Sequence, residues 1–108
     1  MNLKIKFKDK IVMYGRIKDK KIADKCEACV ASNKWFLRHR KYFQYKHIDI
    51  DSKVGKYIAD KYHVIHMPFI VHIIRDKVNG QQIDEPHRTQ GWNEYMWDNL
   101  VESMKAVQ

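Results

Sequence analysis

Residues 26–29 read Cys26-Glu27-Ala28-Cys29, which places the two cysteines of the chain three positions apart. A short apolar run and a polar segment precede the pair, and no proline or glycine follows it as far as Lys41. The cysteines therefore stand at the start of an expected helix. Two thiols one helical turn apart can form a reversible disulfide, a spacing typical of redox proteins in a reducing compartment. The motif predicts a dithiol that exchanges disulfides.

The segment upstream predicts two strands. Residues 3–8 alternate apolar side chains with lysines, the period-two pattern of a half-buried edge strand. Residues 11–14, Ile-Val-Met-Tyr, form a continuous apolar run suited to a central strand covered on both faces. The polar residues 15–25 then predict a loop that ends at the first cysteine.

Two helices with a strand between them are expected next. The first helix covers residues 27–41, residues 43–51 form the strand, and Ser52 can cap the second helix. The first helix is expected to bury a face that includes Val30, Phe36 and Leu37. Apolar side chains of the second helix recur at i, i+3, i+4 and i+8, which predicts its buried face: Val54, Tyr57, Ile58 and Tyr62.

The last third predicts a hairpin and a closing helix. Residues 69–74, Phe-Ile-Val-His-Ile-Ile, are the most strand-like stretch and follow Met67-Pro68, where proline is tolerated. Asn79-Gly80 indicates a turn, and Ile83 anchors a short returning strand, so the expected hairpin covers 69–84. The closing helix, capped by Asn93, carries an apolar stripe: Met96, Leu100, Met104 and Val107, with Trp97 and Val101 beside it.

These elements predict one α/β domain over residues 1–108. A strand-helix-strand unit requires parallel pairing and a hairpin requires antiparallel pairing, so the sheet must be mixed. We expect four central strands flanked by three helices, with an added edge strand in the extension formed by residues 1–10.

Composition narrows the class of protein. The 108 residues are 44% hydrophobic, and no apolar run approaches the roughly 20 residues of a membrane helix, so a cytoplasmic protein without a membrane partner is expected. The net charge is +8, from 21 Lys+Arg against 13 Asp+Glu. Because the cations are spread along the chain, a solvated surface is favoured over nucleic-acid binding. A basic module that binds an acidic protein or nucleic acid, with incidental cysteines, is the alternative.

The helix start suits a reactive thiolate at Cys26. Unpaired backbone N–H groups there, together with the cation of Lys25, favour negative charge on the sulfur. Cys29, one turn later, can attack a mixed disulfide formed at Cys26 and so resolve it. In the other possible use of the pair, His63-x-x-His66 would complete a zinc site, but 33 residues separate Cys29 from His63 and the spacing matches no usual zinc pattern. We therefore expect no metal; a carrier of zinc or an iron-sulfur cluster held by Cys26 of two subunits is a third alternative.

The element order, the cysteine pair and Met67-Pro68 together resemble the glutaredoxin and thioredoxin superfamily over about residues 11–106. Met13-Tyr14-Gly15, a charged loop and Lys25-Cys26-x-x-Cys29 look like the small glutaredoxins encoded by bacteriophages. The resemblance implies a cis Pro68 that packs against the sulfurs and a Met67 backbone that receives the substrate. It also implies a site for the glutathione carboxylate, whose residues are Gly91, Trp92, Asn93 and Glu94.

By the same resemblance, the protein is a monomeric disulfide oxidoreductase with no bound cofactor. Glutathione would re-reduce it, and protein disulfides such as that of ribonucleotide reductase would be its clients. Two departures leave thioredoxin reductase open as the reductant. Glu27-Ala28 replaces the proline-tyrosine usual between glutaredoxin cysteines, and Gln90 stands where a first glycine is expected.

Overall fold

The computed structural model describes residues 5–17 and 26–107, with the backbone alone at residue 107. Lys25, whose cation is predicted to stabilise the Cys26 thiolate, lies outside the described residues, as do residues 3 and 4. No helix in the described part of the chain is long and apolar enough to cross a membrane. The elements are β1 (Asp9–Gly15), α2 (Glu27–His39), β2 (Gln44–Asp49), α3 (Lys53–Lys61), β3 (Phe69–Arg75), β4 (Gln82–Gln90) and α4 (Glu94–Val107).

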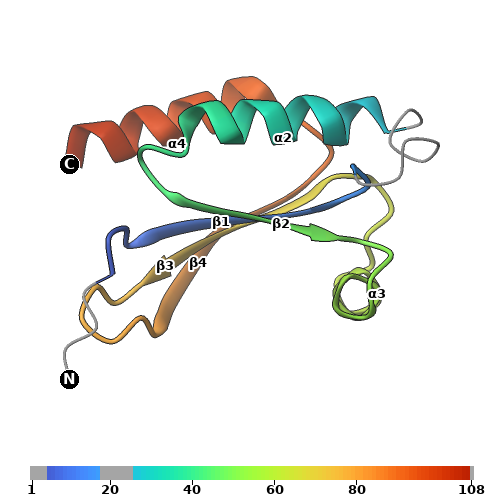
Figure 1. Ribbon diagram of the computed structural model, residues 1–108, viewed down its shortest axis with the longest axis horizontal. Coiled ribbons are helices and arrows are strands. Elements are labelled where there is room, and N and C mark those ends of the chain that lie inside the picture. Colours follow the sequence, from blue (N-terminus) through green and yellow to red (C-terminus); the bar gives the residue numbers. More distant parts are fainter. Residues whose placement is uncertain (1–4, 18–25, 108) are drawn as a thin grey trace.

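The sheet is mixed and has the strand order β2-β1-β3-β4. β1 pairs in parallel with β2 and antiparallel with β3, which pairs antiparallel with β4. Helices α2 and α4 cover one face of this sheet, and α3 lies on the other (Figure 1). The expected four-stranded sheet with three helices on two faces is confirmed.

The predicted N-terminal edge strand is wrong over the residues that can be seen. Residues 5–8 form no strand, although their apolar and basic side chains alternate. β1 already has β2 and β3 on its two sides, so the segment that leads into it crosses the end of the hairpin instead. Ile5 N donates to Lys77 O at 3.1 Å, and Arg75 Nη2 donates to Phe7 O at 2.9 Å.

The hairpin is longer than predicted, because β4 continues through Pro86 to Gln90. β4 is an edge strand, so a proline that cannot donate a hydrogen bond is tolerated within it. The pairing of β3 with β4 also shifts register between His72 and Ile74, close to this proline. Pro86 lies beyond the predicted end of the hairpin at residue 84, and in the structure it marks an irregularity inside the strand.

The main core lies between the sheet and the helices α2 and α4. Its buried members are Ile11, Met13, Trp35, Phe36, Phe43, Ile70, Trp97, Val101 and Met104. Of the expected stripe of α4, Met104 is buried and Met96 and Leu100 are partly buried, whereas Trp97 and Val101, expected beside the stripe, are fully buried. Asn93 Oδ1 accepts from Met96 N as the expected cap. The side chain at 107 lies outside the described residues.

The buried face of α2 differs from the expected one. Phe36 is buried as predicted, but Leu37 is 42% exposed and Val30 only half-buried. The face that meets the sheet includes Cys29 and Ser32, which are small side chains that a search for large apolar residues passes over. Phe36 is fully buried, with ring centroids 5.1 to 6.0 Å from those of Trp35, Phe43, Tyr45, Trp92 and Trp97.

The predicted buried face of α3 is also wrong, since Val54 and Tyr57 are 56% and 63% exposed. The helix instead approaches the end of β2 through Gly55, its one buried residue. A Cβ atom at position 55 would lie 2.6 Å from Ile50 Cα, so only glycine allows this close approach. The predicted cap is confirmed, because Ser52 Oγ accepts from Gly55 N at 3.0 Å.

A buried polar group crosses the sheet at the start of β1. His72 Nε2 lies 2.8 Å from Asp9 Oδ1, and both side chains are nearly fully buried. His72 Nδ1 in turn lies 3.2 Å from Nδ1 of His87 on β4. Burial and then the neighbouring His72 lower the pKa of His87, against a smaller opposing effect of Asp84. Folding therefore disfavours the protonated form of His87.

We expect His87 to make the protein less stable in weak acid. Below the ordinary histidine pKa of 6.5, His87 is protonated in the unfolded chain but stays neutral in the folded protein. The free energy of unfolding therefore falls as the pH drops from 6.5 towards the lowered pKa. His87→Gln should remove this part of the pH dependence. Urea midpoints of both proteins at about pH 7.5 and pH 5.5 test it, with exposed His66→Gln as the control. An equal loss of stability in His87→Gln would contradict the assignment.

Candidate functional site

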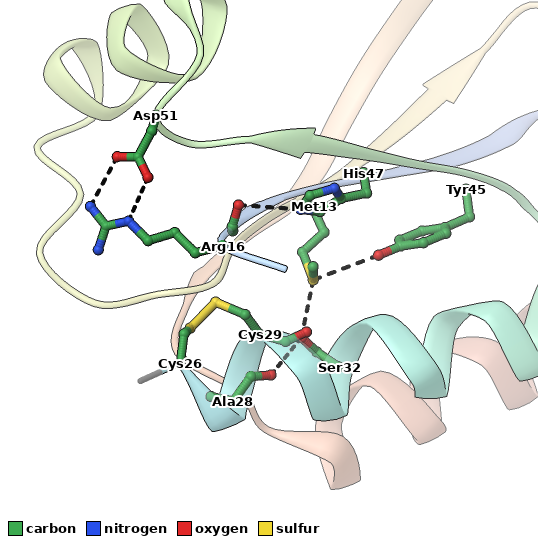
Figure 2. The surroundings of a disulfide bond; sticks show 10 residues. Met13, Arg16, Cys26, Ala28, Cys29, Ser32, Tyr45, His47 and Asp51 are labelled. Carbon is green, nitrogen blue, oxygen red and sulfur yellow. Dashed lines mark hydrogen bonds and ion pairs between the residues drawn. A yellow bond between two sulfur atoms is a disulfide. The ribbon is translucent and has the colours of Figure 1, made fainter. Parts of the chain in front are cut away.

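The two cysteines form a disulfide at the start of α2, with their Cα atoms 5.3 Å apart (Figure 2). Cys26 occupies the N-cap position, and its carbonyl accepts from the backbone N–H groups of Cys29 and Val30. Cys26 is 7% exposed and Cys29 fully buried. The predicted placement of the pair at the helix start is confirmed, and Cys26 is the more accessible of the two sulfurs.

The helix start favours a negative charge on the Cys26 sulfur once the disulfide is reduced. Within the described residues no side chain caps α2, so the N–H groups of Glu27 and Ala28 and the positive end of the helix dipole can act on the sulfur. Glu27 adds an opposing negative charge in the first turn. The balance favours Cys26 as the attacking sulfur, with the contribution of Lys25 still a prediction.

A tightly packed group of residues fixes the position of Cys29. A Cβ atom added to Gly15 would lie 3.0 Å from Cys29 Sγ, so β1 ends directly against this sulfur. Behind it, Ser32 Oγ lies 2.7 Å from Ala28 O and 3.0 Å from Met13 Sδ. Tyr45 OH, which donates to Asn33 Oδ1 at 2.8 Å, also lies 3.6 Å from Met13 Sδ (Figure 2). The sequence interpretation missed this group, whose only local signal was a glycine at the end of an apolar run.

Met67-Pro68 precedes β3, and the peptide bond between the two residues is cis, as the resemblance implied. Pro68 is buried and Met67 half-buried. Pro68 O accepts from Gly91 N at 2.9 Å, which extends the ladder between β3 and β4 towards the site. The packing of Pro68 against the sulfurs and the use of the Met67 backbone by a substrate remain predictions.

Gln90 holds the loop that leads into Met67. Its Oε1 accepts from Ile65 N at 2.8 Å and from His66 N at 3.0 Å, and its Nε2 donates to His63 O at 3.4 Å. One amide thus fixes three successive parts of a loop that follows α3. In the sequence, Gln90 stood out only because it replaces an expected glycine. That long amide in place of a small residue was the one sign that the side chain has a role in holding the loop.

Gln90→Ala should free this loop without unfolding the protein. The amide protons of Ile65 and His66 lose their acceptor, so we expect each to exchange with solvent at least about tenfold faster. Hydrogen exchange followed by NMR measures this. Gln82→Ala on the same strand is the matched control, because Gln82 is also exposed and its side chain makes no hydrogen bond in the described structure. Unchanged exchange rates at residues 65 and 66 would show that the conformation of the loop does not depend on the Gln90 side chain.

The segment expected to take the glutathione carboxylate lies at the start of α4. Gly91 has a φ of 83°, and nothing lies within 4 Å of the place where its Cβ would be. The ring of Trp92 packs on Trp35 and Phe36, and the Asn93 side chain caps the helix. Glu94 is exposed. The groups of this segment that could bind an anion are the backbone N–H groups at the start of α4. Binding of the glutathione carboxylate here stays a prediction.

A cavity of about 350 Å³ adjoins the cis bond, between the end of β1 and α3. Its lining residues are Arg16, Ile50, Asp51, Lys56, Ala59, Val64, Ile65 and Met67. Arg16 donates two hydrogen bonds to Asp51, at 2.7 and 3.1 Å, and thereby lowers the pKa of that carboxyl (Figure 2). Arg16 follows Gly15, which meets Cys29, and Lys56 of α3 is the second cation that lines the cavity.

The described residues do not bring the two cysteines and the two histidines of the alternative zinc site together. No cluster of three or more His, Cys, Asp or Glu side chains within residues 5–17 and 26–107 could hold a metal ion. His63 follows the end of α3, and His66 lies in the loop before Met67; both are exposed.

The architecture is similar to that of thioredoxins. A thioredoxin of Plasmodium falciparum matches with a TM-score of 0.65 at 13% identity, over 94% of this chain and 75% of that one. Thioredoxin-2 of the malaria parasite protein secretion machinery gives 0.62 at 15% identity, over 94% and 85%. Oxidized thioredoxin O2 of Arabidopsis thaliana gives 0.60 at 13% identity, over 88% and 73%. Comparisons with family models and with curated proteins give no significant match.

At these identities the likeness shows the fold. The chain has the thioredoxin-like α/β fold that the sequence predicted, with a disulfide of CxxC spacing at its first described helix.

Proposed function

We propose that this protein is a thiol-disulfide oxidoreductase that works through Cys26 and Cys29. The observation that carries the proposal is the disulfide at the start of α2, in a fold whose similar solved structures are thioredoxins. Ile65, 80% exposed and two residues before Met67, offers an apolar contact for a protein substrate. The oxidised pair is then the product of one turnover.

The reaction starts from the dithiol. The Cys26 thiolate attacks one sulfur of a substrate disulfide, forms a mixed disulfide with it, and releases the other sulfur as a thiolate that takes up a proton. Deprotonated Cys29 then attacks Cys26 Sγ, which breaks the mixed disulfide and releases the second substrate thiol. Two electrons pass to the substrate, and Cys26–Cys29 becomes a disulfide. A reducing compartment such as the cytoplasm would have to supply the reductant.

Glutathione is the reductant we propose. Two glutathione thiols would open the Cys26–Cys29 bond in the reverse sequence and leave as glutathione disulfide. Support comes from the cavity beside Met67, where Lys56 could attract a carboxylate, and from the anion-attracting start of α4. A glutaredoxin-like role follows, with protein disulfides such as that of ribonucleotide reductase as clients.

A thioredoxin role is the second candidate, favoured by the similarity to solved thioredoxins. In that case a thioredoxin reductase would reduce the disulfide directly. The two candidates differ in the source of electrons, while the steps at Cys26 and Cys29 are the same.

Two coupled assays separate these candidates. NADPH oxidation is followed with a small disulfide substrate, once with glutathione and glutathione reductase and once with thioredoxin reductase. We expect turnover in the first, and Lys56→Gln to lower its kcat/KM about threefold to tenfold by removing a cation near the carboxylate. Lys53→Gln on the same helix is the control, since Lys53 does not line the cavity. Turnover with thioredoxin reductase alone would support the second candidate, and no turnover in either would contradict both.

A further inference from the structure

The sheet face that carries α3 is covered at one end only. Tyr62, beside α3, contacts Phe69 of β3, and Phe69 pairs with Tyr14 of β1. Alternate residues of these strands share that face, and they run from this contact towards the start of β1. Figure 1 shows no described helix beneath that far part. The exposed end of the sheet is therefore separate from the disulfide, at a distance of about 17 Å from Lys10 to Gly15 along β1.

Three cations cross this open part of the sheet in a row. Lys10 of β1 pairs with Gln44 and Ile73, whereas Lys46 of β2 lies two residues further along, opposite Val12. Arg75 of β3 lies two residues in the other direction, since its N–H donates to Lys8 O. Neighbouring side chains of the row are thus one strand and two residues apart, a diagonal of about 8 Å, so the row spans about 16 Å.

The row has no counter-charge among the described residues. None of Lys10, Lys46 and Arg75 forms an ion pair there, and the carboxylate of Asp76 next to Arg75 is occupied by the turn, accepting from Val78 N and Asn79 N. Burial and then the charges of Arg75 and Lys46 lower the pKa of Lys10. The fold thus holds three like charges together without a carboxylate partner in the described part of the chain, and Arg75 Nη2 donates to the neutral carbonyl of Phe7.

We propose that this row, Lys10, Lys46 and Arg75, binds the phosphate backbone of a nucleic acid. A strand of duplex DNA carries one charge per roughly 3.4 Å of axis, so a straight row of about 16 Å faces about five phosphates. The exposed Lys6 and Lys8, from the alternating lysines that the redox chemistry leaves unused, adjoin one end of the row. Even spacing on a flat face suits a regular polyanion better than the scattered carboxylates of a protein.

Binding at the row should be independent of base sequence. The strands beside the row offer no exposed aromatic ring among the described residues, since Phe69 is buried and Tyr14 is half-buried, so stacking on bases next to the row is not available. Backbone contact without base contact gives affinity that depends steeply on salt and little on sequence. The dithiol at the other end of β1 stays free, so the reaction proposed above neither requires this binding nor is blocked by it.

The test compares two triple variants of equal charge. Lys10→Gln/Lys46→Gln/Arg75→Gln removes the row, and Lys34→Gln/Arg38→Gln/Lys53→Gln removes three exposed cations of α2 and α3. Binding of a fluorescent DNA duplex of mixed sequence and about 20 base pairs is measured between about 50 and 200 mM salt. In the row variant, we expect the slope of log K, the association constant, against log salt to be shallower by about 2.7, because three phosphate contacts are lost. Between the two salt concentrations the affinity of the row variant should therefore fall about 40-fold less than that of the wild type. The slope of the control variant should stay closer to the wild-type slope than the slope of the row variant does.

Other outcomes decide against the proposal. An equal loss in both variants would mean that net charge alone attracts DNA. Polyglutamate that competes as well as DNA at equal charge would assign the row to an acidic polypeptide instead. Circular dichroism and turnover of a small disulfide should match those of the wild type in the row variant, which excludes unfolding as the cause of lost binding.

Discussion

Cys26→Ser is expected to abolish disulfide reduction, with turnover of a small disulfide at least about a thousandfold lower than in the wild type. A serine hydroxyl stays protonated at neutral pH and cannot start the exchange. The substitution replaces one atom at a site that is 7% exposed, so the fold should be retained. Turnover in either coupled assay measures the effect.

Cys29→Ser is the matched variant, and it should behave differently. Cys26 can still attack, but no second thiol is present to release the substrate. We therefore expect a mixed disulfide to accumulate on Cys26, seen by mass spectrometry as the added mass of one substrate thiol. If Cys26→Ser accumulated this adduct and Cys29→Ser did not, the assigned roles of the two sulfurs would be exchanged.

The second large effect is expected at Phe36. This ring is fully buried and contacts five other aromatic rings between the sheet and the helices. Phe36→Ala removes that contact area and leaves a cavity, which should lower the free energy of unfolding by about 3–5 kcal/mol. Because domains of this size are stable by only about 5–15 kcal/mol, the urea midpoint should fall steeply.

The neighbouring residue supplies the control for that experiment. Leu37 is 42% exposed, so Leu37→Ala should cost below about 1 kcal/mol. The pair also tests the orientation of α2, because the sequence placed both side chains on its buried face. Equal losses in the two variants would mean that α2 is rotated from the orientation described.

Signals within a few residues of one another were sufficient for most of the fold. The helix start at the cysteines, the caps Ser52 and Asn93, and the strand after Pro68 depend on local spacing and turn chemistry, and the structure has them. The missed features depend on distant parts of the chain. Residues 5–8 alternate like a strand, but whether a strand has a free edge to pair with is decided by the whole sheet.

The faces of the helices show the same limit. The periodicity of α3 predicted a buried face with Val54 and Tyr57, which are exposed. The helix meets the sheet through Gly55, which has no side chain to contribute to a pattern. In the candidate site, Cys26, Cys29 and the cis bond at Pro68 came from motifs. Gly15, Ser32 and Gln90 act through contacts between separate elements, which spacing along one chain does not contain.

Pro86 has a consequence for behaviour at high concentration. The outer side of β4 is nine residues long, and a strand edge of that length can act as a template on which further copies add as an extended, aggregating sheet. A proline without an N–H group and the register shifts near it interrupt the row of donors and twist the edge. The irregularity at Pro86 therefore protects the protein against fibril-like association.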